Sequence, residues 1–146
     1  MADTIKTKWL YPPNWDGELR DKGGWKKVHI IRTCQSDGTG ETDAIVLNIS
    51  ELRTTEGLEV KRTAIESIKW HTYGYYQVIL EWDRTPDEHI LTLSGDKSGF
   101  SDFKSSGGLV DPGEADVGTG DIIVTTTGAD NYDNYTIELV VKLKAD

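Results

Sequence analysis

The sequence predicts an all-β fold: a single antiparallel β-sandwich or jelly-roll-like domain of about 7–8 strands with an extended N-terminal arm. Three observations support this prediction. Residues 65–84 alternate apolar and polar side chains, 15 glycines supply turns, and threonine, isoleucine and valine are plentiful where alanine and leucine are sparse. The 146 residues fit one domain, which we divide into an arm at 1–26 and a β-sandwich domain at 27–146.

The arm is expected to be extended, because the consecutive prolines Pro12 and Pro13 disfavour both helix and central strand. It carries four large side chains that are candidates for binding a partner: Trp9, Leu10, Tyr11 and Trp15. Such side chains are unfavourable in water and are common anchors at protein interfaces. The arm therefore either folds back over the domain or inserts into a neighbouring protein, and the sequence leaves both arrangements open.

Three strands are expected before the central segment. Residues 25–33 form the first, with Val28 and Ile30 on one face. Residues 43–52 form the second, and residues 58–63 form a short strand or an edge connection. In the second strand, one face consists of alternate apolar residues: Ile45, Leu47 and Ile49.

Residues 65–84 are predicted to form a β-hairpin with its turn at Tyr73 and Gly74, where glycine adopts positive φ without steric cost. The first arm of the hairpin places Ile68 and Trp70 on one face. In the second arm, one face consists of alternate residues: Tyr76, Val78, Leu80 and Trp82. This segment is rich in buriable aromatic area, so we expect it to act as scaffold.

A long irregular stretch separates the last strands. Residues 94–119 are rich in glycine, and a loop of this length is usually functional or packed by its own side chains. We expect Phe100 and Phe103 to pin it to the core, and we count both, with Leu109, among the candidate partner-binding residues. The remaining strands are expected at 89–93, 121–127 and 135–144.

The net charge of −9 argues against a nucleic-acid partner, because phosphate binding needs a basic surface. It permits docking on a basic patch of another protein. The sequence shows no apolar run long enough to span a bilayer and no signal-peptide pattern, so we expect no membrane partner. The single cysteine, Cys34, excludes an internal disulfide and is expected to be inert.

No catalytic motif is recognisable, and we expect a protein that is not an enzyme and has no catalytic residue, no metal and no cofactor. The histidines His29, His71 and His89 lack the spacing of metal ligands. Acidic loops offer weak calcium sites as a lesser alternative to solvated turns. Their carboxylates are Asp37, Glu41 and Asp43, then Asp111, Glu114 and Asp116, and finally Asp130 and Asp133. Exposed aromatic residues are a further alternative, for stacking on sugars or filling a partner's pockets: Trp15, Tyr73, Tyr75 and Tyr132.

The order of these signals over about residues 27–144 resembles small virion structural proteins of marine tailed bacteriophages. The resemblance rests on the opening Met1-Ala2-Asp3-Thr4, on Ser36-Asp37-Gly38-Thr39-Gly40-Glu41, on residues 65–83 ending in Leu80-Glu81-Trp82-Asp83, on Gly107-Gly108-Leu109-Val110-Asp111-Pro112, on the run from Gly118-Thr119-Gly120-Asp121 to Thr126, and on a final Tyr-x-Ile-x-Leu strand. It is a pattern of turns and strands rather than a catalytic signature.

The resemblance implies a non-enzymatic virion component, and within that class we expect a capsid decoration (cement) protein. Such a protein docks on the major capsid protein or on other virion proteins, forms a homo-oligomer with a trimer favoured, and lies on the capsid exterior after assembly in the bacterial host cytoplasm. Its arm and glycine-rich loop are expected to bury aromatic area across subunit boundaries. Two alternatives stay open: a neck or tail component of the head-closure or tail-tube type, and a carbohydrate-binding β-sandwich on the virion surface.

Overall fold

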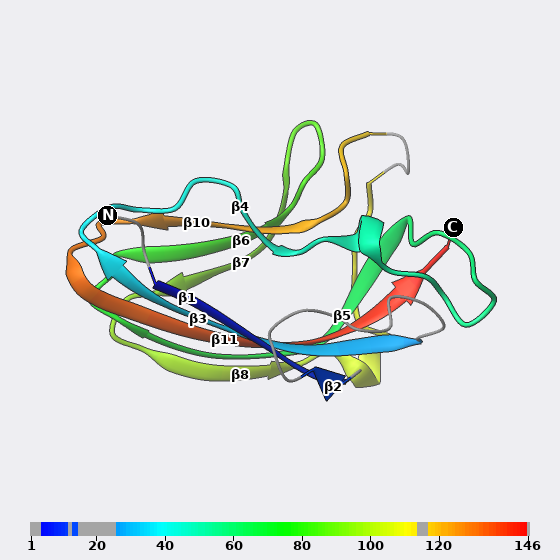
Figure 1. Ribbon diagram of the computed structural model, residues 1–146, viewed down its shortest axis with the longest axis horizontal. Coiled ribbons are helices and arrows are strands. Elements are labelled where there is room, and N and C mark those ends of the chain that lie inside the picture. The colour runs from blue at the N-terminus through cyan, green and yellow to red at the C-terminus, as the bar shows by residue number, and fades with distance from the viewer. Residues whose placement is uncertain (1–3, 12, 15–25, 114–116, 146) are drawn as a thin grey trace.

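The computed structural model describes residues 4–11, 13–14, 26–113 and 117–145 of the chain. Two sheets stack face to face (Figure 1). The larger sheet contains β1 (Thr4–Tyr11), β2 (Pro13–Asn14), β3 (Lys27–Asp37), β5 (Arg62–Tyr73), β8 (Ser98–Asp102), β9 (Leu109–Val110) and β11 (Asn131–Lys144). The smaller sheet contains β4 (Ala44–Leu47), β6 (Gln77–Trp82), β7 (Glu88–Ser94) and β10 (Ile122–Thr127).

Every pair of neighbouring strands among the described residues is antiparallel, which confirms the predicted all-β sandwich class. The larger sheet has the order β2-β1-β3-β11-β5-β8, with β9 also pairing with β5, and the smaller sheet has the order β4-β10-β6-β7. The two helical segments of the described chain, Ile49–Glu51 and Lys104–Ser106, are single 3-10 turns. Neither has the length and apolar character that crossing a bilayer requires.

The core lies between the sheets and follows the two-residue period of the long strands. In β3 the buried apolar residues are Val28, Ile30 and Cys34. In β11 the alternation expected at 135–144 is complete, and the buried residues are Tyr135, Ile137, Leu139, Val141 and Leu143. Because alternate side chains point to opposite faces, these central strands supply a continuous apolar inner surface.

The prediction of a hairpin at 65–84 is wrong. Strand β5 pairs with β11, β8 and β9, whereas β6 pairs with β10 and β7, so this segment crosses from one sheet to the other. The crossing is made by Gly74, Tyr75 and Tyr76, with Gly74 at a φ of 90°. Tyr75 turns inward between the sheets and Tyr76 turns outward, which reverses the faces expected for these two tyrosines. Both strands keep their apolar faces on the core because they face each other across it.

Two further expectations are corrected. The predicted strand at 43–52 ends at Leu47 and continues as a 3-10 turn, and a register shift beside β10 leaves Ile45 exposed rather than on the face of Leu47. The region 94–119, expected to be irregular, contains β8, a 3-10 turn and β9. Within that region Phe103 packs against the core as expected, but Phe100 is exposed.

The described part of the N-terminal segment folds back on the domain. Strand β1 pairs with β3 over most of its length, from Thr4 opposite Gln35 to Tyr11 opposite His29, with a shift between Trp9 and Tyr11. The backbone of residues 4–11 therefore belongs to the larger sheet. Residues 15–25, which include Trp15, lie outside the described residues.

Candidate functional site

The candidate partner-binding residues do not converge on one surface. Trp9, Phe103 and Leu109 are partly buried and pack against the core. Leu10 and Tyr11 lie in β1, and their side chains, like Trp15, are outside the described set. Phe100 is 62% exposed. Since β1 and β8 lie toward opposite edges of the larger sheet, Trp9 and Phe100 belong to separate regions.

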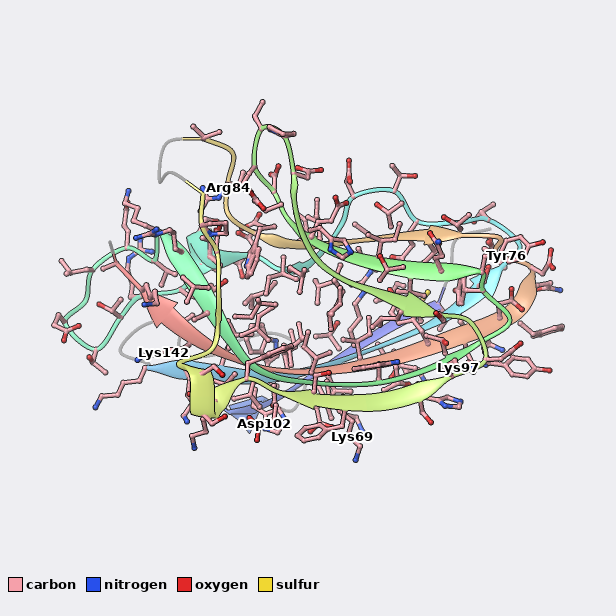
Figure 2. All side chains as sticks on the ribbon, turned by 180° about the vertical axis from the view of Figure 1, so that it is seen from behind. Lys69, Tyr76, Arg84, Lys97, Asp102 and Lys142 are labelled. Carbon is pink, nitrogen blue, oxygen red and sulfur yellow. The ribbon has the colours of Figure 1, made fainter. Side chains whose placement is uncertain are left out.

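Phe100 stands on the outer face of β8, the edge strand of the larger sheet. Its register partner on β5 is Lys69, and the other side of β8 has no strand partner among the described strands. Figure 2 labels Lys69 and Asp102 on this outer side of the sheet. A large apolar ring beside unpaired edge groups is a feature that natural sheets usually avoid or cover.

Shallow hollows flank this phenylalanine. The first is lined by Lys69, Trp70, His71, Ser98, Thr136 and Glu138. The second is lined by Lys27, Glu66, Ser67, Phe100, Asp102, Lys104 and Val140. Their volumes of 180 and 190 Å³ fall below the range of roughly 300–1,000 Å³ typical of small-molecule pockets. Shallow relief around an exposed ring suits the side chains of a partner surface better than an enclosed substrate.

One ion pair and one histidine–carboxylate contact join neighbouring β-strands on the same outer face. Lys27 Nζ lies 3.1 Å from Glu66 Oε1, and His29 Nε2 lies 2.6 Å from Glu138 Oε1. Both pairs are partly exposed, so each contributes little to stability. They join polar side chains of neighbouring strands on this sheet face.

A second exposed surface lies where β5 and β10 end and β6 and β11 begin. Tyr73, Tyr76 and Tyr132 are 58%, 78% and 68% exposed, and we call this group the tyrosine end. Of the aromatic candidates named from the sequence, Tyr73 and Tyr132 belong to it. Tyr75, also a candidate, is instead buried with its ring 5.8 Å from that of Tyr135. The two-residue period places Tyr76 on the core face, and only the crossing between sheets turns it outward.

Three carboxylates meet on the smaller sheet. Ligand oxygens of Asp43, Glu81 and Asp87 lie within 4.8 Å of one another. Partial burial, followed by the charges of Asp87 and Asp43, raises the pKa of Glu81, while the nearby His89 acts in the opposite direction. Calcium takes about 6–8 oxygen ligands. One oxygen from each of these three groups is too few to complete such a site. The main consequence of this grouping is repulsion between the negative charges of the three carboxylates.

Two carboxylates of the other acidic loops, Glu41 and Asp111, act inside the fold, whereas Glu114 and Asp116 lie outside the described residues. Glu41 accepts hydrogen bonds from Arg32 Nη2 and from the Tyr135 hydroxyl, both at 2.5 Å. Burial raises the pKa of the Tyr135 hydroxyl, so it remains a donor in this network. Asp111 is fully buried and accepts hydrogen bonds from Nε and Nη2 of Arg84. These loop residues neutralise buried arginines that lie 9 and 27 positions away in the sequence.

Among the described residues, His29 and His89 contact polar side chains, His71 is exposed on β5, and Cys34 is buried. His29 pairs with Glu138, and His89 lies 2.8 Å from the Thr92 hydroxyl. Cys34 is fully buried, with its sulfur 3.9 Å from the Tyr75 hydroxyl. A thiol in apolar surroundings is a weak nucleophile.

Comparisons with known proteins found no matching protein-family model and no matching curated protein. Among solved structures, two variants of the family 29 carbohydrate-binding module CBM29-2 have TM-scores of 0.34 and 0.35 at 10% and 12% identity. The matches cover 99% and 98% of this chain and 93% and 87% of those chains. A crystal structure of Fe(II) HppE has a TM-score of 0.29 at 7% identity, and the match covers 78% of this chain and 42% of that one. Similarity at this level supports no inference about function.

Proposed function

We propose that this protein is a non-enzymatic virion structural protein, a capsid decoration protein that docks on the major capsid protein lattice of a tailed bacteriophage and stabilises the head. The resemblance over about residues 27–144 supports the class. The observation that carries the docking role is the exposure of Phe100 on the edge strand β8. Docking takes place on the capsid exterior, with a homo-oligomer, a trimer by preference, as the docked unit.

Phe100 has the properties of an interface anchor. Aromatic residues concentrate binding energy at the centres of protein interfaces, where surrounding contacts exclude water. The two hollows beside Phe100 offer places for a partner's side chains, and the free side of β8 offers backbone groups for pairing with another strand. A partner that covers this edge removes the apolar ring from water and provides hydrogen bonds for the backbone groups of the edge.

The strands behind Phe100 make the surface rigid. β8 pairs with β5 over five residue pairs, and β5 pairs with β11 along nearly its whole length. A surface that is already ordered loses little conformational entropy on docking. Because a decoration protein of this kind binds only the assembled lattice, it stabilises the shell by mass action.

The test is binding of the purified full-length chain to capsid shells that lack it, followed by sedimentation of the shells. We expect saturable binding, and we expect Phe100→Ala to weaken it by at least about tenfold, equivalent to about 1.4 kcal/mol. Leu58→Ala is the matched control, because Leu58 is similarly exposed but lies on a loop away from β8, and it should leave binding unchanged.

Several outcomes would reject parts of this proposal. Absence of binding to any shell rejects the decoration role. Binding confined to a single ring at the portal vertex, seen by electron microscopy, supports the neck or tail alternative instead. Equal binding by the Phe100→Ala and wild-type proteins rejects the edge of β8 as the docking surface.

A further inference from the structure

Three of the six tyrosines in the chain are exposed together at one end of the sandwich. Tyr73 ends β5, where it is the register partner of Asn134 in β11, two residues beyond Tyr132. Tyr76 is the last residue of the crossing between the sheets, and its backbone N–H donates to the Thr127 carbonyl 3.0 Å away. Figure 2 labels Tyr76 and Lys97 at this same end of the molecule. The tyrosine end is thus formed by turns that are distant in sequence but adjacent in space.

Hydrogen bonds lock these turns together. The Gly74 N–H donates to Asp96 Oδ1 at 2.9 Å, and the Gly95 N–H donates to the Tyr76 carbonyl at 3.1 Å. The Asp130 N–H donates to Asp133 Oδ2 at 2.7 Å. The rings are therefore presented on connected turns of defined geometry, and little ordering is required when a ligand binds.

Close packing and backbone strain are concentrated at the same place. A Cβ at Gly128 would come within 2.5 Å of the Tyr76 ring, so this ring lies directly against the β10–β11 turn. A Cβ at Gly74 would come within 1.9 Å of the Asp133 carboxylate. Tyr132 has a φ of 72°, a conformation that bulky side chains rarely adopt. Strain of this kind is commonest at ligand-binding and catalytic sites.

The chemistry of this surface selects its ligand. Each tyrosine offers an aromatic face and a hydroxyl, which together suit a molecule with apolar CH faces and many hydroxyl groups. Asp96 and Asp130 are exposed beside the rings and disfavour anionic ligands. Lys97 shares a turn with Asp96, and the backbone hydrogen bonds accepted by Asp96 and Asp133 fix these carboxylates in place without removing their charge, so a basic peptide is the competing ligand in the test below.

We propose that the tyrosine end is a binding site for neutral oligosaccharides, which stack the CH faces of their pyranose rings on Tyr76 and Tyr132 and exchange hydrogen bonds with the surrounding carboxylates and hydroxyls. This inference is independent of capsid docking, because it concerns the loops at the end of the sandwich and not the edge of β8. On a decoration protein, such a site presents a glycan-binding surface at the outside of the head.

The experiment is isothermal titration of the full-length chain with cellohexaose, laminarihexaose and mannohexaose, together with an array of neutral and acidic glycans. We expect at least one neutral oligosaccharide to bind. Tyr76→Ala should weaken that binding by about tenfold, the ratio that corresponds to one aromatic stacking contact of about 1.4 kcal/mol. Tyr76→Phe and Tyr132→Phe keep the ring and should retain most of the affinity, and Phe100→Ala, outside this end, should retain all of it.

Thermal unfolding of each variant shows whether it is folded, so that loss of binding is assigned to the missing ring. The proposal is overturned if no neutral glycan binds the wild-type chain, or if Tyr76→Ala and Tyr132→Ala bind as the wild type does. Salt-sensitive binding to a Lys- and Arg-rich peptide in place of a glycan would also overturn it, in favour of a basic protein partner. Capsid sedimentation of the same variants is a separate readout, so failure here leaves the docking role to its own test.

Discussion

The two ends of the sandwich differ in how their connections are held. At the tyrosine end the crossings are short: Gly74–Tyr76 joins β5 to β6, and residues 95–97 join β7 to β8. They are fixed by backbone hydrogen bonds, by the carboxylates of Asp96 and Asp133, and by the close approach of glycines to neighbouring turns. Tyr75 turns into the core, whereas Tyr73, Tyr76 and Tyr132 remain outside. Short connections leave little chain to cover these three rings, so they face solvent or a ligand.

The opposite end carries long connections and needs an internal anchor. The Arg84 side chain is buried, with Nη2 2.6 Å from Asp111 Oδ2, Nη1 2.9 Å from the Val117 carbonyl and Nη2 3.2 Å from the Lys61 carbonyl. One guanidinium therefore ties two long connections to the end of β6. Gly113 completes the packing, because a Cβ there would come within 2.5 Å of the Arg84 side chain.

The two ends of the sandwich therefore differ in what their side chains do. The end with the long loops is held by the buried Arg84–Asp111 pair, whereas the tyrosine end, whose turns also use carboxylates internally, exposes three aromatic rings. A buried ion pair is costly to break, because removing one partner leaves an uncompensated charge in the interior. Variants at the two ends should therefore fail in different ways.

The largest effect is expected at the arginine anchor. Arg84→Ala leaves Asp111 buried without its counter-charge and should lower the free energy of unfolding by about 3–5 kcal/mol. Urea denaturation followed by tryptophan fluorescence measures this loss. Lys61→Ala is the matched control, because its exposed pair with Glu59 should be worth less than about 1 kcal/mol, and its backbone carbonyl remains available to Arg84.

A double variant shows whether the pair is needed for its charge or only for its shape. Arg84→Met combined with Asp111→Leu removes both charges and should recover most of the stability lost in Arg84→Ala. If Arg84→Ala unfolds at the urea concentration of the wild type, the long-loop end does not depend on this anchor. The proposed contrast between the two ends would then be lost.

An intermediate effect is expected at Gly95 in the tyrosine end. A Cβ at this position would lie 1.5 Å from the backbone oxygen of Tyr75, so Gly95→Ala forces the backbone to move and should destabilise the fold by about 1–3 kcal/mol. It should also weaken oligosaccharide binding, because the turn that carries Tyr76 shifts. Urea denaturation and titration with the hexasaccharides measure the two effects.

Gly57 is the control for this variant at the long-loop end. It has a φ of 80°, and a Cβ added there would meet no heavy atom of a more distant residue within 4 Å. Gly57→Ala should therefore cost only the strain of a Cβ in the left-handed conformation, about 1–2 kcal/mol, with no effect on ligand binding. Equal loss of oligosaccharide binding in both variants would mean that the tyrosine end responds to general destabilisation. Its turns would then not be specifically locked.

The sequence was sufficient for the features that depend on local periodicity. The alternation at 135–144 and within 25–33 correctly predicted strands and the buried faces of their described residues, because a half-buried strand imposes a two-residue period wherever it lies. The same periodicity does not identify the partners with which those strands pair. The pattern at 65–84 is the same for a hairpin and for a crossing between sheets, since both place the apolar faces of two strands on one core.

The candidate surfaces depended on contacts that leave no local signal. Tyr75 and Tyr76 are adjacent, and only the direction of the crossing decides which of them is buried. Arg84 and Asp111 are separated by 27 positions, so nothing near Asp111 marks it as a counter-ion rather than a calcium ligand. Phe100 and Tyr132 were identifiable as candidates by residue type, but their exposure follows from their positions on an edge strand and on a strained turn.

The smallest effect is expected at Glu81. Its carboxylate lies beside those of Asp43, which follows a loop of the tyrosine end, and Asp87, which lies in the β6–β7 turn. Partial burial and these two charges raise the pKa of Glu81, so the folded state holds the proton more tightly than the unfolded state does. Its contribution to stability is therefore complete at low pH and is lost as the pH rises through the raised pKa.

Glu81→Gln should accordingly stabilise the fold by less than about 1 kcal/mol near neutral pH, because the group is partly exposed to solvent. Thermal unfolding at about pH 7 and about pH 4 measures the difference, which should shrink at the lower pH as the wild-type carboxyl becomes protonated. Glu88→Gln, at an exposed position on the neighbouring strand β7, should change little at either pH. A destabilised Glu81→Gln near neutral pH would mean that the charge of Glu81 is satisfied by a favourable partner, such as a cation held by the three carboxylates, rather than opposed by its neighbours.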